Sequence, residues 1–407
     1  SHLSPGQFGR VMTQSTEWRR HVPELVEQVL PEVTRIRHRL HQIPELALRE
    51  QETSAVIRQA LAEMGLQAGK PLLGTDVIAL LKGPQPGPNV TLRADIDALP
   101  LHEATGLPYQ SSHDGTMHAC GHDGHTAMLL GAALVLCRLQ AELRGSVRFV
   151  FQPGEEVVAA GKDLVAAGAL LDPSPAAVMA LHAWPALPAG VICSRPGPIM
   201  AAAEFFKITI RGQGGHGSRP EESVDPILTA ARVVEALQSV VSRHISPLEA
   251  AVVSVCRFSA GSNSNVIPAT AELEGTTRSL NLEVGKRLPV VMERLIRGVC
   301  EAMGATYDFH YTGSYIPTVN DAGIVALGRQ VAETVLGHDG WLDLKHPSMA
   351  GEDFAYYVRD YPGAMFFLGM GEASAPLHSP QFDFNDTALR NGITFTVCAA
   401  LEALSRG

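Results

Sequence analysis

The chain has 407 residues, with 42 Asp and Glu residues against 32 Lys and Arg residues and a formal net charge of −10 at pH 7. Beyond roughly 250–300 residues chains usually divide into domains, so we expect two domains. The acidic balance argues against a protein that binds nucleic acid or a membrane surface, because neither phosphate backbones nor anionic lipids attract a negatively charged protein.

The cysteines and apolar runs point to a cytoplasmic protein. A chain of this length can build a core without disulfides, and no CxxC pair occurs, so we expect reduced thiols. The longest apolar run, Ala127 to Cys137, has about half of the roughly 20 residues that span a bilayer. We expect a natural start at Met12 and no signal peptide. The six cysteines are Cys120, Cys137, Cys193, Cys256, Cys300 and Cys398.

The first half of the chain alternates between predicted helices and strands. Apolar residues at helical spacing predict helices at Pro23–His41 and Glu52–Met64. Alternation of this kind indicates an α/β sheet with helices on both faces. The further elements are strands at Val77–Leu81, Val90–Leu92, Val147–Phe151 and Ala177–Leu181 and helices at Thr126–Leu139 and Leu164–Ala167.

The pattern changes after Pro198 to the order βαββαβ, which is that of a ferredoxin-like domain and is complete by itself. We therefore expect a lid or dimerisation domain of residues 199–312, inserted into a catalytic domain of residues 12–198 and 313–407. The inserted elements are strand Glu204–Ile210, helix Pro226–Arg243, strands Ala251–Phe258 and Ala269–Thr277, helix Val284–Met303 and strand Thr306–Tyr311. Later elements are helices at Ile324–Leu336, at Phe354–Tyr357 and from Asp386, and a strand at Met365–Leu368.

Three histidines, one cysteine and one aspartate gather within the eight residues HACGHDGH at positions 118–125. Thiolates and imidazoles are good ligands for zinc-like ions. Side chains two apart in an extended stretch point to the same side, so Cys120 and His122 could reach one site. A buried cysteine among hydrogen-bonded histidines is the structural alternative.

Carboxylates and two further histidines follow predicted strands. Glu155 and Glu156 end FQPGEE at the carboxyl end of a strand, where ligands of open α/β sheets collect. One such carboxylate can bind a metal while the other accepts a proton from water. His182 follows another strand, His378 lies on a proline-rich loop, and Asp97 can hydrogen-bond a ligand imidazole from behind. Solvated acids, structural histidines and a turn or helix cap at Asp97 are the alternatives.

The sequence lacks the motifs of nucleotide-binding proteins and of serine hydrolases. The glycine-rich Gly212–Gly217 has no Gly-Lys-Ser/Thr ending and no later acidic ribose partner, so a loop that presents His216 is favoured over a phosphate loop. No Gly-x-Ser-x-Gly elbow occurs, so a serine hydrolase has no support.

Taken together, these segments resemble the M20 metallopeptidases, in particular the aminoacylase/amidohydrolase branch that includes hippurate hydrolases and plant auxin-conjugate hydrolases. The matching stretches run in family order from about Leu92 to Asp386 and cover most of the chain. They are LRADIDALP, MHACGHDGHTAMLLGAA, FQPGEE, LHAWPALPAG, GGHGSRPEESVDPI, SNVIPATAELEGTTR, AGEDFAYY and LHSPQFDFND.

The resemblance implies a zinc-peptidase-like catalytic domain with a mixed central sheet, and a homodimer formed through the inserted domain. It implies two divalent ions (zinc, manganese, cobalt or nickel), with Glu155 as the general base and Asp97 supporting the metal site. In the inserted domain, His216, Asn265 and Arg278 resemble residues that contact the carbonyl oxygen and carboxylate of the substrate. The implied metal ligands are Cys120, His122, Glu156, His182 and His378.

The expected activity is hydrolysis of small N-acyl amino acids into a carboxylic acid and an amino acid, with Glu155 acting on a water shared by the two ions. Alternatives are a dipeptidase or carboxypeptidase on the same scaffold, a cysteine hydrolase that uses Cys120, and a non-catalytic binding protein. Two departures from the family pattern bear on metal preference and selectivity. Asp95 stands where many wider M20 members have a metal-binding histidine, and residues 157–161 replace a glycine-rich run.

Overall fold

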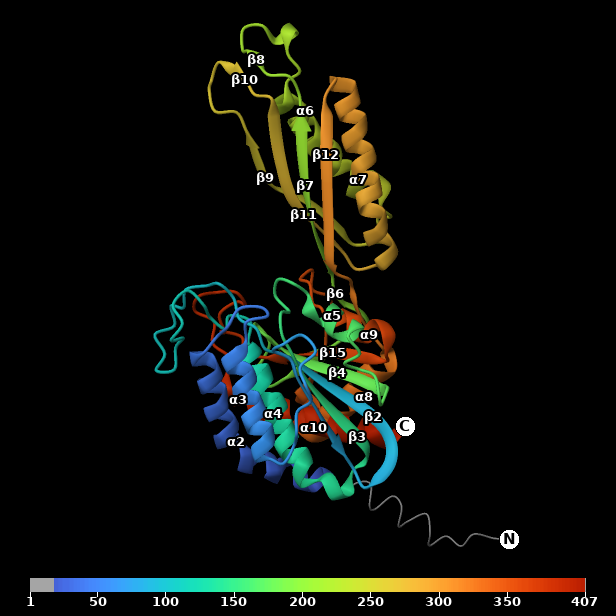
Figure 1. Cartoon of the computed structure of the whole chain (residues 1–407). Helices are drawn as coiled ribbons and strands as arrows, with labels where there is room; N and C mark the ends of the chain where they lie inside the picture. Colours follow the sequence, from blue (N-terminus) through green and yellow to red (C-terminus); the bar gives the residue numbers. More distant parts are fainter. Residues whose placement is uncertain (1–17, 407) are drawn as a thin grey trace, which may run out of the picture. The chain divides into compact units, whose positions relative to one another are not determined.

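The computed structural model describes residues 18–406, which divide into two compact units (Figure 1). Unit 1 comprises the described chain up to Gly197, Val319–Lys345 and the chain from Tyr356 onward. Unit 2 comprises Pro198–Thr318 and His346–Ala355. The expected start at Met12 lies outside the described residues. Within residues 18–406, no helix is long and apolar enough to cross a membrane.

Unit 1 is built on a seven-stranded mixed sheet in the order β1-β3-β2-β4-β15-β5-β14. Strands β3, β2, β4 and β15 run parallel to one another, whereas β1 is antiparallel to β3 and β5 is antiparallel to β15. The carboxyl ends of the four parallel strands therefore meet at one edge. The strands are β1 Val77–Lys82, β2 Gln85–Asp95, β3 Arg144–Gln152, β4 Pro175–Trp184, β5 Ile192–Ser194, β14 Trp341–Asp343 and β15 Gly363–Gly369.

Helices of unit 1 pack against this sheet and bury one continuous apolar core. Helix α4 is buried along nearly its whole length, and both α2 and α10 pack against it. Figure 1 shows α2, α3 and α4 side by side. The helices are α2 Trp18–Gln42, α3 Gln51–Glu63, α4 His122–Arg138, α5 Ala160–Ala166, α8 Ala322–Leu336, α9 Ala355–Asp360 and α10 Leu389–Arg406.

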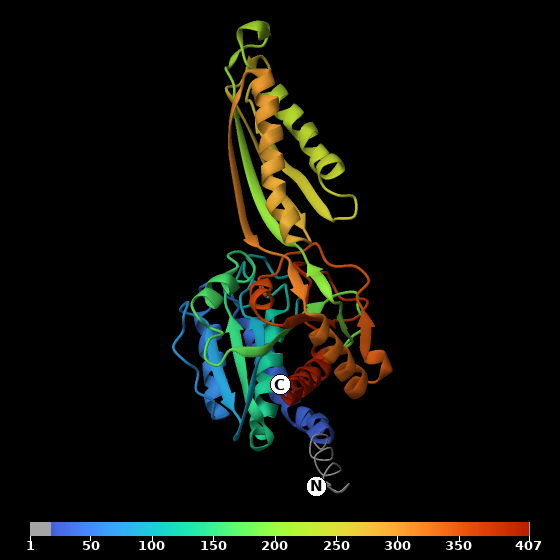
Figure 2. The same cartoon turned by 90° about the vertical axis from the view of Figure 1, so that its right-hand side faces the viewer.

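Unit 2 is a four-stranded antiparallel sheet in the order β12-β7-β11-β9, with α6 and α7 packed on one face around a separate core (Figure 2). This is the strand order of a ferredoxin-like βαββαβ fold, so the predicted α/β class with a small inserted fold is confirmed. The elements are β7 Ala202–Arg211, α6 Pro226–Ser239, β9 Ala251–Ala260, β11 Thr270–Ser279, α7 Leu282–Met303 and β12 Thr306–Tyr315.

Local signals explain where the helices of unit 2 begin and end. The carboxylate of Asp225 caps α6, and the side-chain oxygen of Asn281 accepts from the backbone N–H groups of Glu283 and Val284 in the first turn of α7. Gly304 ends α7 with φ +72°, a conformation that glycine adopts without strain.

Four strands of two to four residues form two small two-stranded sheets. β6 Gly197–Met200 pairs with β13 Thr318–Asn320, and β8 Gly215–His216 pairs with β10 Val266–Ile267.

Candidate metal centre

The carboxyl ends of the parallel strands carry most of the predicted site residues. β2 ends at Asp95, two residues before Asp97, and β3 ends three residues before Glu155. His182 lies near the end of β4. The loop after β15 carries His378. Because these strands are neighbours, residues that are far apart in sequence meet at the edge where open α/β sheets bind ligands.

The cysteine–histidine segment is shaped by a glycine. Helix α4 begins at His122, four residues earlier than the predicted Thr126, and Gly121 before it has φ +84°. A Cβ at Gly121 would lie 2.9 Å from the Cβ of Ala183, so packing also requires glycine here. The expectation that Cys120 and His122 lie in one extended stretch is therefore wrong. A left-handed glycine stands between the two residues, and His122 belongs to a helix, yet both side chains lie close to Glu156.

The loop that carries His378 is tied to this segment through the backbone. The backbone N–H of His378 donates to the carbonyl oxygen of Ala119, one residue before Cys120, at 2.7 Å. His378 has φ +62°, which is strained for a residue with a side chain. Strain of this kind is typical of functional sites, where surrounding contacts hold a residue in one position.

Three of the predicted ligands meet the fourth, Glu156, and the fifth, His182, joins them through Cys120. The Nε2 atom of His122 lies 3.6 Å from Glu156 Oε1, and the Nε2 atom of His378 lies 3.3 Å from Glu156 Oε2. The Sγ atom of Cys120 lies 3.6 Å from His182 Nε2. The ligand atoms of Cys120, Glu156 and His378 all lie within 4.8 Å of one another, and the same holds for His122, Glu155 and Glu156. The predicted base therefore lies among the predicted ligands.

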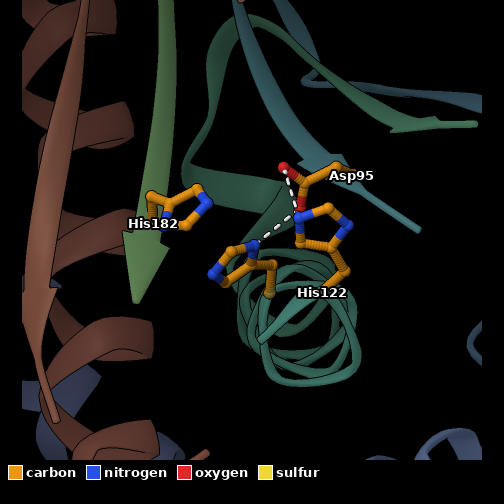
Figure 3. Close-up of side chains that lie close together, drawn as sticks. Asp95, His122 and His182 are labelled. Atoms are coloured by element: carbon orange, nitrogen blue, oxygen red, sulfur yellow. Dashed lines mark hydrogen bonds and ion pairs between the residues drawn. The ribbon is translucent and has the colours of Figure 1, made fainter. Parts of the chain in front are cut away.

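Backbone carbonyls orient two of the imidazoles. His122 Nδ1 lies 2.9 Å from the carbonyl oxygen of Asp97, and His182 Nδ1 lies 2.8 Å from the carbonyl oxygen of Ala183. A carbonyl can only accept, so each Nδ1 carries a proton, and each Nε2 faces the cluster, where it can offer its lone pair to an ion once it is unprotonated. Figure 3 shows the ring of His182 directed from its strand toward His122 and Asp95.

Asp97 contacts two residues of the cluster. Its Oδ1 atom lies 3.2 Å from His122 Nδ1, and its Oδ2 atom accepts from the backbone N–H of Glu156 at 3.0 Å. One carboxylate thus orients a predicted ligand imidazole and anchors the backbone of a predicted ligand carboxylate. Support of this kind fixes the tautomer and direction of a metal ligand.

The cluster has polar atoms that a cation would satisfy. Among the described residues, His122 Nε2 and Glu156 Oε1 are buried without a hydrogen-bond partner. Burial opposes the imidazolium form of His122, but Asp95, Asp97 and Glu156 raise its pKa to about 10. Burial, Glu156 and Glu155 raise the pKa of the Cys120 thiol. A divalent ion would take the place of the extra proton on His122 and favour the Cys120 thiolate.

Two residues that were given no ligand or catalytic role join the cluster. Asp95, His122, His125 and His182 have ligand atoms within 4.8 Å of one another. The spacing of His125, three residues after His122, is a helical signal that places both on one face, but only once the helix is known to begin at His122. Burial opposes ionisation of Asp95, but His122, Arg93 and His125 hold its pKa well below the usual range.

The predicted substrate-binding residues lie in unit 2. His216 in β8 pairs with Val266 in β10, and the backbone N–H of Gly217 donates to the carbonyl oxygen of Asn265 at 2.9 Å, so His216 and Asn265 are neighbours. Arg278 lies in β11, with its guanidinium carbon 6.0 Å from the centre of the Phe205 ring. Their role in substrate binding stays a prediction.

The sequence profile of peptidase family M20/M25/M40 matches residues 91–402. The chain belongs to this family. An N-acetylcysteine deacetylase of Bacillus subtilis is 43% identical over 356 residues, which cover 87% of this chain and 92% of the relative. An N-acyl-L-amino acid amidohydrolase of Geobacillus stearothermophilus is 41% identical over 300 residues, which cover 74% of this chain and 80% of the relative.

A solved structure shows the same fold as this M20 hydrolase. It is that of the Bacillus subtilis YXEP protein, described as a dinuclear metal binding peptidase of the M20 family. The TM-score is 0.82 at 36% identity, over 93% of this chain and 99% of the other. The family resemblance is thus confirmed, and the chain is a metal-dependent amidohydrolase of the M20 family.

The donor atoms of this M20 hydrolase fit divalent ions. One thiol, three imidazoles and a carboxylate converge, and two of their buried atoms have no hydrogen-bond partner among the described residues. Zinc, manganese, cobalt and nickel all accept such a mixed set of sulfur, nitrogen and oxygen ligands. The residues therefore suit the dinuclear centre of the family.

Proposed function

We propose that this M20 hydrolase cleaves the amide bond of N-acyl amino acids and releases a carboxylic acid and a free amino acid. The observation that carries the proposal is the convergence of the thiol, imidazole and carboxylate groups around Glu156, with Glu155 beside them. Relatives named N-acetylcysteine deacetylase and N-acyl-L-amino acid amidohydrolase support this class of substrate.

Five side chains would hold two divalent ions in this proposal. When bound, the ions would act as Lewis acids and lower the pKa of water from about 15.7 toward roughly 7. Asp97 holds the imidazole of His122 in the tautomer that directs Nε2 into the centre. The five side chains are those of Cys120, His122, Glu156, His182 and His378.

Glu155 is proposed as the general base and then the general acid. The residue is 5% exposed, and its carboxylate lies within 4.8 Å of ligand atoms of His122 and Glu156. It would take a proton from the attacking water as the new C–O bond forms at the amide carbon. It would then deliver that proton to the nitrogen as the C–N bond breaks, so that the amino acid leaves as an amine.

The residues of unit 2 are proposed to bind the rest of the substrate. The Nδ1 atom of His216 accepts from the backbone N–H of Ser218 at 3.1 Å, so the ring proton is on Nε2 and can be donated to a substrate oxygen. Arg278 is proposed to pair with the carboxylate, and Asn265 to contact the substrate beside His216. A homodimer through unit 2 is also proposed, with sedimentation analysis as its test.

Removal of divalent ions is expected to abolish activity, and adding them back to restore it. The reason is that the proposal assigns the activation of water to the ions. The measurement is the rate of N-acyl amino acid hydrolysis after dialysis against a chelator and after reconstitution. Activity that survives the chelator but is lost on treatment with an alkylating agent would instead support a cysteine hydrolase that uses Cys120.

The reconstituted protein, tested on a panel of substrates, separates the remaining alternatives. The panel contains hippurate, acetyl-amino acids, indoleacetyl-amino acids and dipeptides. The proposal predicts turnover of the N-acylated compounds, with the preferred acyl group identified by comparing kcat/KM. A preference for dipeptides with a free amino group would reject it in favour of a dipeptidase, and no turnover of any member by the reconstituted protein would support a binding protein.

The substitution Arg278→Ala is expected to raise KM for substrates with a free carboxylate by roughly 10- to 150-fold, because a hydrogen bond to a charged group contributes about 1.5–3 kcal/mol. The methyl ester of the same substrate should show little change. Arg257→Ala is the matched control, because Arg257 on neighbouring β9 forms an exposed pair with Glu274. An unchanged KM in the Arg278 variant would reject the proposed role.

A further inference from the structure

His125 lies among the predicted ligands, yet both of its ring nitrogens already have partners. Its Nδ1 atom lies 2.6 Å from Asp95 Oδ1, and its Nε2 atom accepts a 2.8 Å hydrogen bond from the backbone N–H of Ala183. The residue is 2% exposed. Distance alone would make it a candidate ligand, because it belongs to the group with Asp95, His122 and His182.

The hydrogen bonds determine the tautomer of His125. A backbone N–H can only donate, so Nε2 carries no proton and its lone pair is occupied. The proton is on Nδ1 and is donated to Asp95, whose other oxygen accepts from Arg93 Nη1 at 3.0 Å. Arg93 is held in turn by a 3.0 Å hydrogen bond from its Nε atom to the side-chain oxygen of Gln152.

The backbone N–H of Ala183 needs His125 as an acceptor because strand β2, the neighbour of β4 on this side of the sheet, does not extend as far as Ala183. The ladder between β2 and β4 ends at the pair Arg93 and Ala180, three residues before Ala183. Ala183 is fully buried, so without His125 its N–H would be left unsatisfied, which is strongly unfavourable. His125 thus takes the place of a strand partner at the end of β4.

We propose that His125 is a positioning residue that orients His182 for the metal centre and binds no ion itself. The same residue, Ala183, has its N–H held by His125 and its carbonyl oxygen bonded to His182 Nδ1 at 2.8 Å. Movement of this residue would therefore turn the imidazole of His182. A continuous chain of hydrogen bonds runs from Arg93 through Asp95, His125 and Ala183 to His182.

The test compares His125→Phe with His125→Gln in the full chain, and it rests on the proposed metal centre. Phenylalanine keeps a flat ring but makes neither hydrogen bond, whereas the amide of glutamine can accept from Ala183 and donate to Asp95. Zinc affinity and stoichiometry are measured by titrating the metal-free protein in competition with a chelator. We expect the Phe variant to bind two ions with affinity weakened by about 10- to 100-fold, as for other groups behind metal ligands. The Gln variant should recover most of this loss.

Unchanged zinc affinity in the Phe variant, no recovery of affinity in the Gln variant, or one bound ion fewer in both variants would overturn the proposal.

Histidine ¹⁵N NMR of the unsubstituted protein is the second measurement, with the His125 signals identified by their absence in the Gln variant. They should show protonated Nδ1 and unprotonated Nε2 without zinc, and should not move into the metal-bound range when zinc is added. This result can be obtained even if the Phe variant does not fold. If the unsubstituted protein binds no zinc, the proposed function fails. The NMR spectrum still measures the tautomer of His125 in that case, so the two failures can be distinguished.

Discussion

Replacing Glu155 with glutamine is expected to lower kcat by about 10²- to 10⁴-fold while both ions remain bound. Glutamine keeps the size of the side chain but cannot accept the proton of the attacking water, and a positioned acid or base contributes a factor of this size. Two quantities are measured: kcat on an N-acetyl amino acid, and the metal content of the desalted protein by inductively coupled plasma mass spectrometry. A kcat loss without a metal loss is the signature of a base.

The adjacent carboxylate provides the matched control. Glu156→Gln should lose metal together with activity, because Glu156 lies 3.6 Å from His122 Nε2 and 3.3 Å from His378 Nε2 through its two oxygens. If Glu155→Gln loses metal to the same extent as Glu156→Gln, Glu155 is a ligand and the assignment of the base is wrong. If kcat of the Glu155→Gln variant is unchanged, a residue other than Glu155 transfers the proton.

Arg37→Met is expected to lower the free energy of unfolding by about 3–5 kcal/mol, the range for breaking a buried ion pair. The side chain of Arg37 is 0% exposed and donates to Asp123 and Asp386 at 3.1 Å each, and it also pairs with Asp383. Burial opposes ionisation of Asp123, but Arg37 and His41 hold its pKa well below the usual range. Without Arg37, the buried carboxylate of Asp123 keeps His41 as the main neighbour that offsets the cost of burying its negative charge.

Tryptophan fluorescence during urea unfolding measures this effect, because Trp184 and Trp341 belong to unit 1. Arg35→Met is the control, since Arg35 lies on the same helix but is 72% exposed in its pair with Glu32. Exposed pairs contribute about 0–1 kcal/mol, so this variant should unfold almost like the unsubstituted protein. A similar small change in both variants would show that the buried network does not stabilise unit 1.

The hydrogen-bond network around Arg37 could not be predicted from sequence. An arginine on an amphipathic helix is normally exposed, and its burial here depends on carboxylates from α4 and from the segment before α10. The short strands β5 and β14 were missed for a different reason. Three residues are too few to show a periodic pattern, and each strand is held by its neighbours in the sheet.

The sequence by itself determined the α/β class, the βαββαβ order of unit 2, the family and the residue types of the candidate centre, because strand and helix periodicity and short motifs are local properties of the chain. Only the tertiary structure decided which strands are neighbours, and so brought His378 to Cys120 and Glu156. It also decided that His122 begins a helix and that both nitrogens of His125 are occupied. The physical reason is that an imidazole becomes a ligand or a support according to the partners of its two nitrogens, and those partners come from other strands.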